Sequence, residues 1–363
     1  EKPWIMLFFL LICCLFTVKG CALVVLDSDD SRVDYVGRYL LTEQGNAVLS
    51  WGGTTLRLAV KGAGSVAAEL GGGKGGSRFM ALVDGVPLSP FIVTPEPGNY
   101  TLVTGLDAEA SHSVELMKLA EDNVQKGSKG AATFSRFFLR SDGDGDGKID
   151  VSRFQSKARR IHFVGDSDTA GWCADGSPRS GDDANSFQNP YITWAGQLAR
   201  SLDADYYTTA ISGIGVMDWP IQQYLDHTVT FDDTYKWDWT AKSGLPDAVV
   251  VLIGPNDDSS KTSKFKKSYQ DLVTLLGNRY GSSIPVLHVC GGSINGLDPC
   301  DAIKEVVGVE NFVSIKREDW AQINKRTNDF LGCDSHYNER GHEVLMEDVV
   351  EDVKRILGWG GVK

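Results

Sequence analysis

Four short segments in the second half of the chain contain residue types that together could carry out nucleophilic catalysis. They are Gly165-Asp166-Ser167, Ser212-Gly213-Ile214-Gly215, Gly254-Pro255-Asn256-Asp257 and Asp334-Ser335-His336. A serine hydroxyl attacks an ester when a histidine accepts its proton, a further group orients that histidine, and N–H donors stabilise the oxyanion. The serine, glycine, asparagine and histidine of these segments match those tasks in residue type.

The serine of the first segment is the predicted nucleophile. Ser167 follows an apolar run, residues 161–164, so it is expected in a tight turn just past the end of a strand. Its own N–H, the N–H of Gly213 and the side-chain amide of Asn256 are expected to form the oxyanion hole. Glycine suits the second position because no Cβ obstructs the substrate, and Gly215 is an alternative there. The asparagine amide donates hydrogen bonds without carrying charge.

The predicted base is His336. It follows Asp334 closely, in a glycine-bounded loop before the last predicted helix. The other histidines lie in predicted strands, begin that helix, or have no acidic residue at a telling spacing: His112, His162, His227, His288 and His342. Asp334 is the expected third member of a Ser–His–Asp triad, if the loop curls back so that its carboxylate reaches Nδ1. The alternative is that a backbone carbonyl holds the ring, which leaves a Ser–His dyad.

The elements that must position these segments follow from the hydrophobic pattern after Arg159. Apolar strand-like runs alternate there with helical patterns, and this alternation predicts a parallel sheet with helices on both faces. Predicted strands cover 161–164, 205–211, 248–253, 284–289 and 312–315, and predicted helices cover 191–202, 265–280 and 341–357. Active residues of such sheets lie beyond the carboxyl ends of the strands. Because Ser167, Gly213 and Asn256 each follow a predicted strand, they are expected at one rim.

The first part of the chain has a different pattern. From about residue 33 to residue 139, short alternating runs are separated by glycine and proline, and Asp84-Gly85 is a hairpin turn signal. Several short strands without a helical stretch predict a β-sandwich. We therefore divide the chain into a signal peptide (1–20), a β-sandwich domain (21–157) and an α/β domain (158–363).

The amino end is typical of an export signal. Lys2 precedes an apolar block over residues 4–18, and small residues follow where cleavage would occur. The block is shorter than the ~20 residues of a spanning helix, so we predict a secreted protein without a membrane anchor; an uncleaved anchor is the alternative. In an oxidising compartment the favoured disulfides are Cys290–Cys300 and Cys173–Cys333, with buried free thiols as the alternative.

Charge and acidic residues bear on partners and cofactors. The net charge of -12 argues against a nucleic-acid partner, which needs a basic surface. Within residues 142–150, Asp142, Asp144 and Asp146 occupy positions one, three and five of a calcium-loop pattern with glycine at position six. Arg153 stands at position twelve, where a bidentate glutamate is usual, and the preceding residues are strand-like. The segment predicts either a structural calcium site or an acidic solvated turn, whereas catalysis is expected to need no cofactor.

The order and strand context of the four segments resemble the SGNH (GDSL-type) hydrolases. The stretch Cys333-Asp334-Ser335-His336-Tyr337-Asn338-Glu339-Arg340-Gly341-His342 is similar to the Cys-Asp-Trp-His-Pro-Asn…Gly-His stretch of the family-two carbohydrate esterases. Ser212-Gly213-Ile214-Gly215-Val216 and the Lys118…Glu121 stretch also fit that family. The resemblance covers nearly the whole chain after the signal. It implies an N-terminal jelly-roll sandwich and a three-layer α/β/α hydrolase domain. It also implies a secreted, acetyl xylan esterase-like enzyme that removes O-acetyl groups from plant-type or algal polysaccharides through an acyl-enzyme.

The chain departs from the family pattern around the predicted base. Most SGNH enzymes have an aspartate three residues before the histidine, and here Cys333 holds that place. Ser335 replaces the family's tryptophan, so a sugar-stacking aromatic is expected elsewhere. Trp172 and Trp219 are the candidates for such a substrate-binding platform, and tryptophans packed only for stability are the alternative.

Two rival interpretations stand beside an O-acetyl esterase acting on carbohydrate. An SGNH lipase, lysophospholipase or thioesterase needs an apolar groove for a long acyl chain, but the loops beside the motifs, 174–189 and 232–244, are polar. A carbohydrate-binding protein with weak catalysis belongs to a different class. The complete set of serine, glycine, asparagine and histidine argues against a hydrolase domain that has lost its activity.

Overall fold

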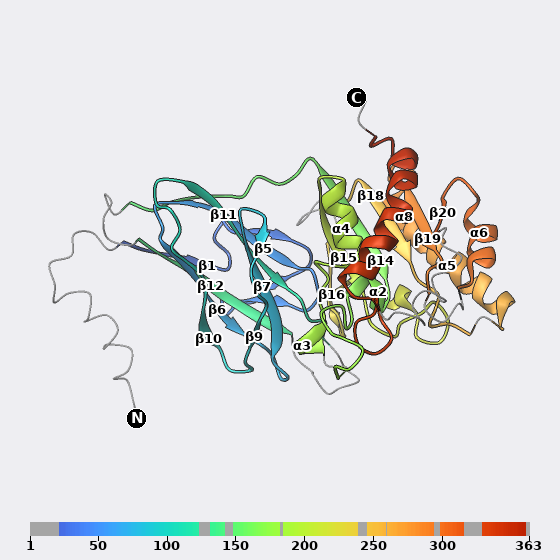
Figure 1. Cartoon of the computed structure of the whole chain (residues 1–363), viewed down its shortest axis with the longest axis horizontal. Coiled ribbons are helices and arrows are strands. Elements are labelled where there is room, and N and C mark those ends of the chain that lie inside the picture. Colours follow the sequence, from blue (N-terminus) through green and yellow to red (C-terminus); the bar gives the residue numbers. More distant parts are fainter. Residues whose placement is uncertain are drawn as a thin grey trace.

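The computed structural model describes residues 22–122, 131–141, 148–181, 184–238, 245–258, 260–293, 298–315 and 329–360. An all-β part and an α/β part lie side by side along the long axis of the molecule (Figure 1). The predicted signal peptide lies outside the described residues. So do Asp142, Asp144 and Asp146 of the predicted calcium loop.

The N-terminal part is a sandwich of two antiparallel sheets. One has six strands: β10 (Gly98–Thr104), β6 (Ser65–Gly71), β12 (Ala132–Arg140), β4 (Ala47–Leu49) and β3 (Leu40–Leu41) in order, with β1 (Leu23–Asp27) on β12. The other has seven: β13 (Asp150–Ser152), β5 (Thr55–Lys61), β11 (Ser111–Lys118), β7 (Ser77–Val83) and β8 (Val86–Pro87) in order, with β2 (Asp34–Val36) on β5 and β9 (Phe91–Val93) on β7. The two sheets enclose a common apolar core.

Alternation along the strands supplies that core. In β6 the apolar Val66, Ala68 and Leu70 are buried, while the residues between them are partly exposed. The predicted turn at Asp84-Gly85 joins β7 to β8, and both residues have positive φ, 53° and 77°. Two consecutive residues with positive φ give a turn whose twist matches that of the flanking strands. The predicted hairpin turn is therefore confirmed.

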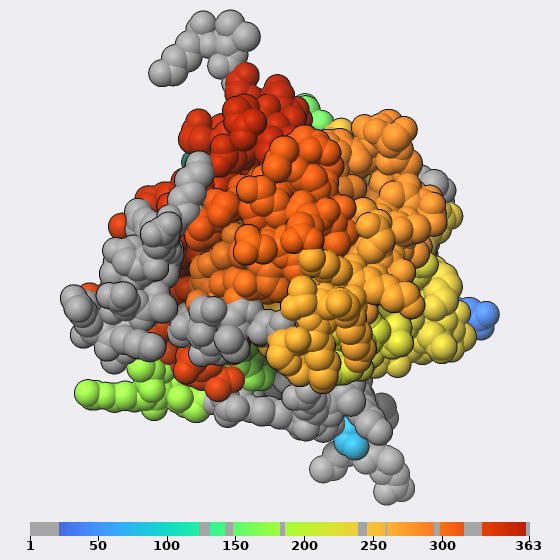
Figure 2. All heavy atoms as spheres, turned by 90° about the vertical axis from the view of Figure 1, so that its right-hand side faces the viewer, coloured from blue at the N-terminus to red at the C-terminus, as the bar shows by residue number. Residues whose placement is uncertain are grey.

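The C-terminal part is built on a five-stranded parallel sheet. Its order is β15 (Ala204–Ala210), β14 (Arg159–Gly165), β18 (Ala248–Leu252), β19 (Val286–Cys290) and β20 (Phe312–Ser314). The longer helices are α4 (Trp194–Ser201), α5 (Thr262–Tyr280), α6 (Cys300–Val307) and α8 (Glu339–Leu357). Figure 2 views the molecule from the side of this part, where residues of the C-terminal half form the surface.

The helices cover both faces of this sheet. In β18, Val250 and Leu252 pack in the cluster that contains α4 and α8, while Val249 and Val251 pack in the cluster that contains α5 and α6. All five residues of β18 are buried, as expected for a parallel strand between two helical layers. The predicted three-layer α/β/α fold is therefore confirmed, with the ends of predicted strands and helices displaced by no more than three residues.

Shorter elements complete the C-terminal part, and the sequence pattern did not predict them. They are α2 (Ser167–Ala170), α3 (Ala184–Phe187), a 3-10 helix η2 (Ile221–Gln223) and a hairpin of β16 (His227–Val229) and β17 (Asp232–Lys236). Within the residues that the structure describes, no helix is both long and apolar enough to cross a membrane.

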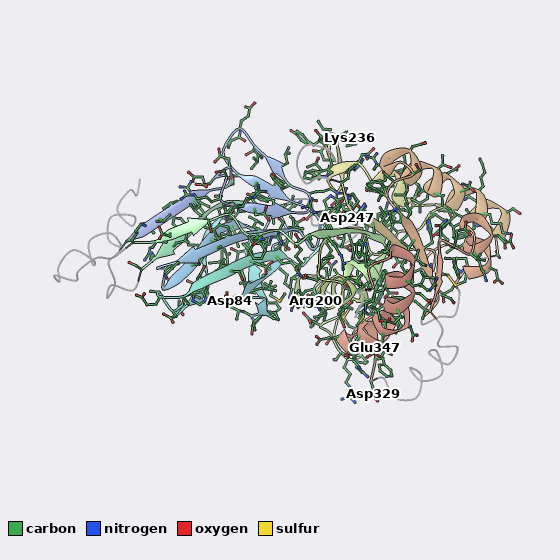
Figure 3. The ribbon with its side chains drawn as sticks, turned by 90° about the horizontal axis from the view of Figure 1, so that it is seen from above. Asp84, Arg200, Lys236, Asp247, Asp329 and Glu347 are labelled. Atoms are coloured by element: carbon green, nitrogen blue, oxygen red, sulfur yellow. A yellow bond between two sulfur atoms is a disulfide. The ribbon has the colours of Figure 1, made fainter. Side chains whose placement is uncertain are left out.

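Buried charges and apolar contacts join the two parts. Arg57 of the sandwich donates to Asp34 of its own sheet and to Asp205 of β15, each at 2.6 Å. Met117 and Leu119, at the end of β11, pack in the same cluster as α4. In Figure 3, Asp84 marks the sandwich and Glu347 marks α8 of the C-terminal part.

Candidate active site

The nucleophile lies where a strand turns directly into a helix. β14 ends at Gly165, Asp166 caps α2, and Ser167 is the first residue of that helix. A Cβ at Gly165 would overlap Thr169 and lie 2.7 Å from the carbonyl oxygen of Leu252, so only glycine fits this turn. Burial, reinforced by neighbouring carboxylates, raises the pKa of the Asp166 carboxyl well above its usual range. Ser167 is largely buried, with 8% of its surface exposed.

The histidine that reaches this serine is His336. Its Nε2 lies 2.9 Å from Ser167 Oγ, and its Nδ1 lies 2.7 Å from the backbone carbonyl oxygen of Asp334. Because a carbonyl oxygen only accepts, Nδ1 must carry the hydrogen of the neutral ring. Nε2 is then unprotonated and accepts from the serine hydroxyl. This tautomer is the one that a general base requires.

The other five histidines bond or pack elsewhere. His162 contacts Tyr280 and Thr209, His288 contacts Tyr269, His227 contacts the Thr230 carbonyl, and His112 pairs with Asp84. His342 is fully buried beside Tyr337, and burial lowers the pKa of its ring to about 3. His336 alone is brought to the nucleophile.

The structure corrects the expected role of the Asp334 carboxylate. That carboxylate accepts a hydrogen bond from Trp172 Nε1 at 3.0 Å, and the backbone carbonyl of the same residue orients His336. Asp334 and Ser335 both have left-handed backbone, with φ of 49° and 57°. This backbone conformation directs the Asp334 carbonyl to the His336 ring and the Asp334 carboxylate to Trp172. The geometry is that of a Ser–His dyad.

A disulfide joins the two sides of this dyad. Cys173, six residues past the nucleophile, is bonded to Cys333, three residues before the base. A Cβ at Gly332 would overlap the carbonyl oxygen of Cys173, so the two segments lie in close contact. The second disulfide is Cys290–Cys300. Both favoured pairings are therefore confirmed.

The two candidate tryptophans are packed into the protein. Trp172 is 6% exposed and contacts the Cys173–Cys333 disulfide and Phe187. Trp219 is half-buried, donates from Nε1 to the Tyr224 hydroxyl at 2.7 Å, and packs against the cluster that contains α5. Trp172 therefore offers no open ring face to a sugar, which corrects the expectation at that position, whereas Trp219 keeps part of its surface exposed and stays a predicted stacking residue.

Two backbone N–H groups are candidates for the oxyanion hole, those of Ser167 and Gly213. Ser167 begins a helix, so its N–H has no intrahelical acceptor. Gly213 is exposed and has a φ of 84°. The alternative, Gly215, donates its N–H to the Trp219 carbonyl at 3.1 Å, and a Cβ there would lie 2.5 Å from the Asp257 carboxylate. Gly215 thus has a structural role, and Gly213 is the better oxyanion donor.

The third expected donor lies beside the same loop. Asn256 Nδ2 donates to the Ile214 carbonyl at 2.9 Å, which uses one of its two hydrogens and fixes the direction of the other. The next residue, Asp257, accepts the N–H groups of Val216 and Met217 at 2.8 and 2.9 Å. The carboxyl ends of β14, β15 and β18 therefore bring Ser167, Gly213 and Asn256 to one rim, as predicted from the sheet.

One residue near the site was missed by reasoning from chemical roles. Glu121 follows the last long strand of one sandwich sheet, and its carboxylate accepts the N–H of Ser212 at 3.0 and 3.3 Å. The only signal in the sequence was the Lys118…Glu121 stretch, which indicated a resemblance and no function. Across the described ranges, no group of three or more His, Cys, Asp or Glu residues is arranged to hold a metal ion.

The chain matches two family models in succession. Residues 35–144 match the carbohydrate esterase 2 N-terminal model, and residues 163–344 match the GDSL-like lipase/acylhydrolase family. A curated relative is the cellulase/esterase CelE of Acetivibrio thermocellus, 28% identical over 357 residues. The alignment covers 92% of this chain and 40% of that relative, so the chain spans less than half of the relative's length.

Solved structures share the same two-part architecture. A family two carbohydrate esterase from Clostridium thermocellum, in complex with cellohexaose, is 26% identical with a TM-score of 0.75, covering 90% of this chain and 99% of that one. An acetyl xylan esterase from the rumen bacterium Butyrivibrio proteoclasticus is 15% identical with a TM-score of 0.76, covering 94% and 100%. The second likeness concerns the fold alone. The chain belongs to the GDSL-like lipase/acylhydrolase family, and its N-terminal part matches the N-terminal domain of carbohydrate esterase family 2.

Proposed function

We propose that this protein is a serine esterase that removes O-acetyl groups from a polysaccharide or oligosaccharide. The observation that carries the proposal is the 2.9 Å contact between Ser167 Oγ and His336 Nε2, with Nδ1 of the same ring held by a carbonyl. A serine hydrogen-bonded to an oriented, neutral histidine is the arrangement that nucleophilic acyl transfer requires.

The reaction follows from this geometry in two halves. His336 takes the proton of Ser167 as Oγ attacks the acetyl carbonyl carbon, and the developing oxyanion accepts from the N–H groups of Ser167 and Gly213 and from Asn256. The tetrahedral intermediate collapses, His336 gives its proton to the departing sugar oxygen, and an acetyl-enzyme remains. Water then attacks that ester with the same base, and acetate leaves.

The proposed substrate class rests on the relatives and on the surroundings of the site. The relatives' names include a carbohydrate esterase bound to cellohexaose and an acetyl xylan esterase. Polar loop residues flank the nucleophile: Asp175 is bonded to Asn189, and Ser177 to Ser180. Such surroundings suit a hydrated sugar better than a long acyl chain, which needs an apolar groove.

Location and cofactors form part of the same proposal. Two disulfides support secretion, because such bonds persist mainly in oxidising compartments. Ser167, His336 and the N–H donors supply the nucleophile, base and oxyanion stabilisation, so we propose chemistry without a metal. A calcium ion at residues 142–150 would act on stability only. A chelator should therefore leave turnover unchanged, even if it lowers the thermal midpoint.

A panel of acyl-chain lengths tests the function directly. Purified protein should hydrolyse p-nitrophenyl acetate, lose activity steeply towards butyrate and octanoate, and release acetate from acetylated xylan or mannan oligosaccharides. Ser167→Ala is the matched control for contaminating esterase. Rates on octanoate that equal or exceed those on acetate would favour a lipase, and binding of oligosaccharide without release of acetate would favour a binding protein.

A further inference from the structure

We infer that Glu121, a residue of the sandwich domain, positions the oxyanion hole of the α/β domain by holding the backbone of Ser212. The inference rests on the proposed function, because it assigns a role within ester hydrolysis. Glu121 does not touch the reacting atoms, so it is a positioning residue and not a catalytic one. Its partner lies 91 residues further along the chain, in the other domain.

Carboxylates anchor the oxyanion loop at both of its ends. Glu121 Oε2 and Oε1 lie 3.0 and 3.3 Å from the backbone nitrogen of Ser212, just before Gly213. Asp257 accepts the two backbone N–H groups that follow the loop, at 2.8 and 2.9 Å. Hydrogen bonds to a carboxylate are shorter and stronger than those to a neutral acceptor. The loop is therefore held from the sandwich on one side and from the α/β domain on the other.

Gly213 needs such an external hold. It is exposed and has a φ of 84°, a conformation that glycine adopts freely and leaves freely. β15 ends at Ala210, so no strand pairing fixes the direction of the Gly213 N–H. Each peptide unit is a rigid plane. The bond to Ser212 N–H therefore orients the 211–212 peptide, and the Ile214 N–H, which donates to the Ile211 carbonyl at 3.3 Å, closes the turn around Ser212 and Gly213. The two bonds together restrict the 212–213 peptide, which carries the Gly213 donor.

The same glutamate is also linked to the nucleophile helix. The backbone N–H of Glu121 donates to Gln188 Oε1 at 3.0 Å, and Gln188 Nε2 donates to the carbonyl of Ala170 at 3.1 Å. Ala170 is the last residue of α2, the helix that begins with Ser167. Gln188 is fully buried. Hydrogen bonds thus connect Glu121 both to the loop that carries Gly213 and, through Gln188, to the helix that carries Ser167.

The Glu121 carboxyl is buried, and its charge depends on the pH near neutrality. The residue is 8% exposed, and burial raises the pKa of its carboxyl to about 7, against the opposing effects of the Ser212 hydrogen bond and the Lys118 ammonium. Lys118 is itself fully buried and donates to the Ser50 carbonyl at 3.1 Å and to Asp122 at 3.3 Å. A buried carboxylate without partners would be strongly disfavoured. The Ser212 hydrogen bond and the Lys118 ammonium offset part of this cost, so the Glu121 carboxylate still forms near neutral pH.

Protonation should therefore weaken the hold on the loop. As pH falls through about 7, the Glu121 carboxylate takes up a proton and becomes a weaker acceptor. His336 must also be unprotonated to act as a base. Two deprotonations then support activity on the acid side, so the plot of log kcat/KM against pH should have a limiting slope above one.

The test compares three variants on p-nitrophenyl acetate. Glu121→Ala should lower kcat by about 10- to 100-fold with little change in KM, as expected for a donor displaced by about an ångström. Glu121→Gln keeps an acceptor oxygen, so it should lose less activity, and its acid-side slope should fall towards one. Glu115→Gln is the matched control, since Glu115 lies in β11, the strand that precedes Glu121, and burial raises the pKa of its carboxyl also.

The outcomes separate this inference from the function on which it rests. Wild-type kcat in Glu121→Ala, or an unchanged acid-side slope in Glu121→Gln, would overturn the positioning role while leaving the esterase intact. If Glu121→Ala does not fold, the nearly isosteric Glu121→Gln decides through its pH profile. Absence of acetate release by the wild-type protein would overturn both.

Discussion

The nucleophile and the base are held in place by different means. Ser167 stands at a junction of regular elements, where β14 ends and α2 begins. His336 stands on a loop with left-handed backbone at the two residues before it, tied to the nucleophile segment by the Cys173–Cys333 disulfide. The parallel sheet therefore determines one position, and a covalent cross-link with close packing determines the other.

This difference shows which kinds of change each side should tolerate. The serine side depends on the sheet, so only a local change or global unfolding should disturb it. The histidine side depends on a disulfide between distant segments, so it should be sensitive to redox conditions and to loop packing. The predictions below compare the two sides, from the largest expected loss of activity to the smallest.

Removing either member of the dyad should have the same large effect. Ser167→Ala and His336→Ala should each lower kcat for p-nitrophenyl acetate by ~10³-fold or more, because members of such a unit act together. Circular dichroism should show intact folding in both. Substantial turnover in either variant would mean that the dyad is assigned to the wrong residue.

Asn256→Ala should cost about 10²- to 10³-fold in kcat, since it removes one oxyanion donor. The matched control is Asn311→Ala, because Asn311 also donates from its side chain to a backbone carbonyl, that of Val307, away from the rim. Steady-state kinetics should show a loss only in the first variant. Equal losses would indicate that Asn256 acts through stability alone.

The disulfide that ties the histidine loop should matter more for turnover than the second disulfide does. A Cys173→Ala/Cys333→Ala variant should lose about 10- to 100-fold in kcat through misplacement of the base, and roughly 2–4 kcal/mol of stability. A Cys290→Ala/Cys300→Ala variant should lose stability while keeping kcat. Urea unfolding and kinetics on the same samples separate the two effects. Equal kcat in both variants would contradict the comparison.

The smallest loss is expected at Asp334. Asp334→Asn leaves the backbone carbonyl on His336 Nδ1 and keeps an acceptor for Trp172, so kcat should fall by no more than about tenfold. A triad carboxylate would give a loss near ~10⁴-fold. Kinetics over a range of pH would detect such a loss, and a value of that size would restore the triad.

Much of the site was predictable because it depends on local patterns. Apolar runs followed by glycine, asparagine or serine indicated strand ends, and parallel strands bring such ends to one rim. The common rim of Ser167, Gly213 and Asn256 follows from that rule, whereas the choice of Gly213 over Gly215 does not. His336 followed from the small number of histidines and from a motif that a known family shares.

The remainder depends on contacts that no local pattern reports. The His336 ring bonds the backbone carbonyl of Asp334 and not its carboxylate because residues 334 and 335 both have positive φ. Neither residue is a glycine, so no sequence pattern indicated this conformation. The burial of Trp172 follows from a disulfide across 160 residues. Glu121 approaches the oxyanion loop from another domain. The helix α6 was not among the predicted helices, although its buried residues Ala302, Ile303 and Val307 have helical spacing.

The disulfide between residues 173 and 333 also limits how early during synthesis the enzyme can reach its active form. During synthesis, the first of these thiols emerges 160 residues before its partner, so the bond cannot close until most of the chain has left the ribosome. A reducing cytosol would keep both thiols free. We therefore expect the newly made chain to remain poorly active until an oxidising compartment, such as the one that the proposed secretion would provide, allows this bond to form.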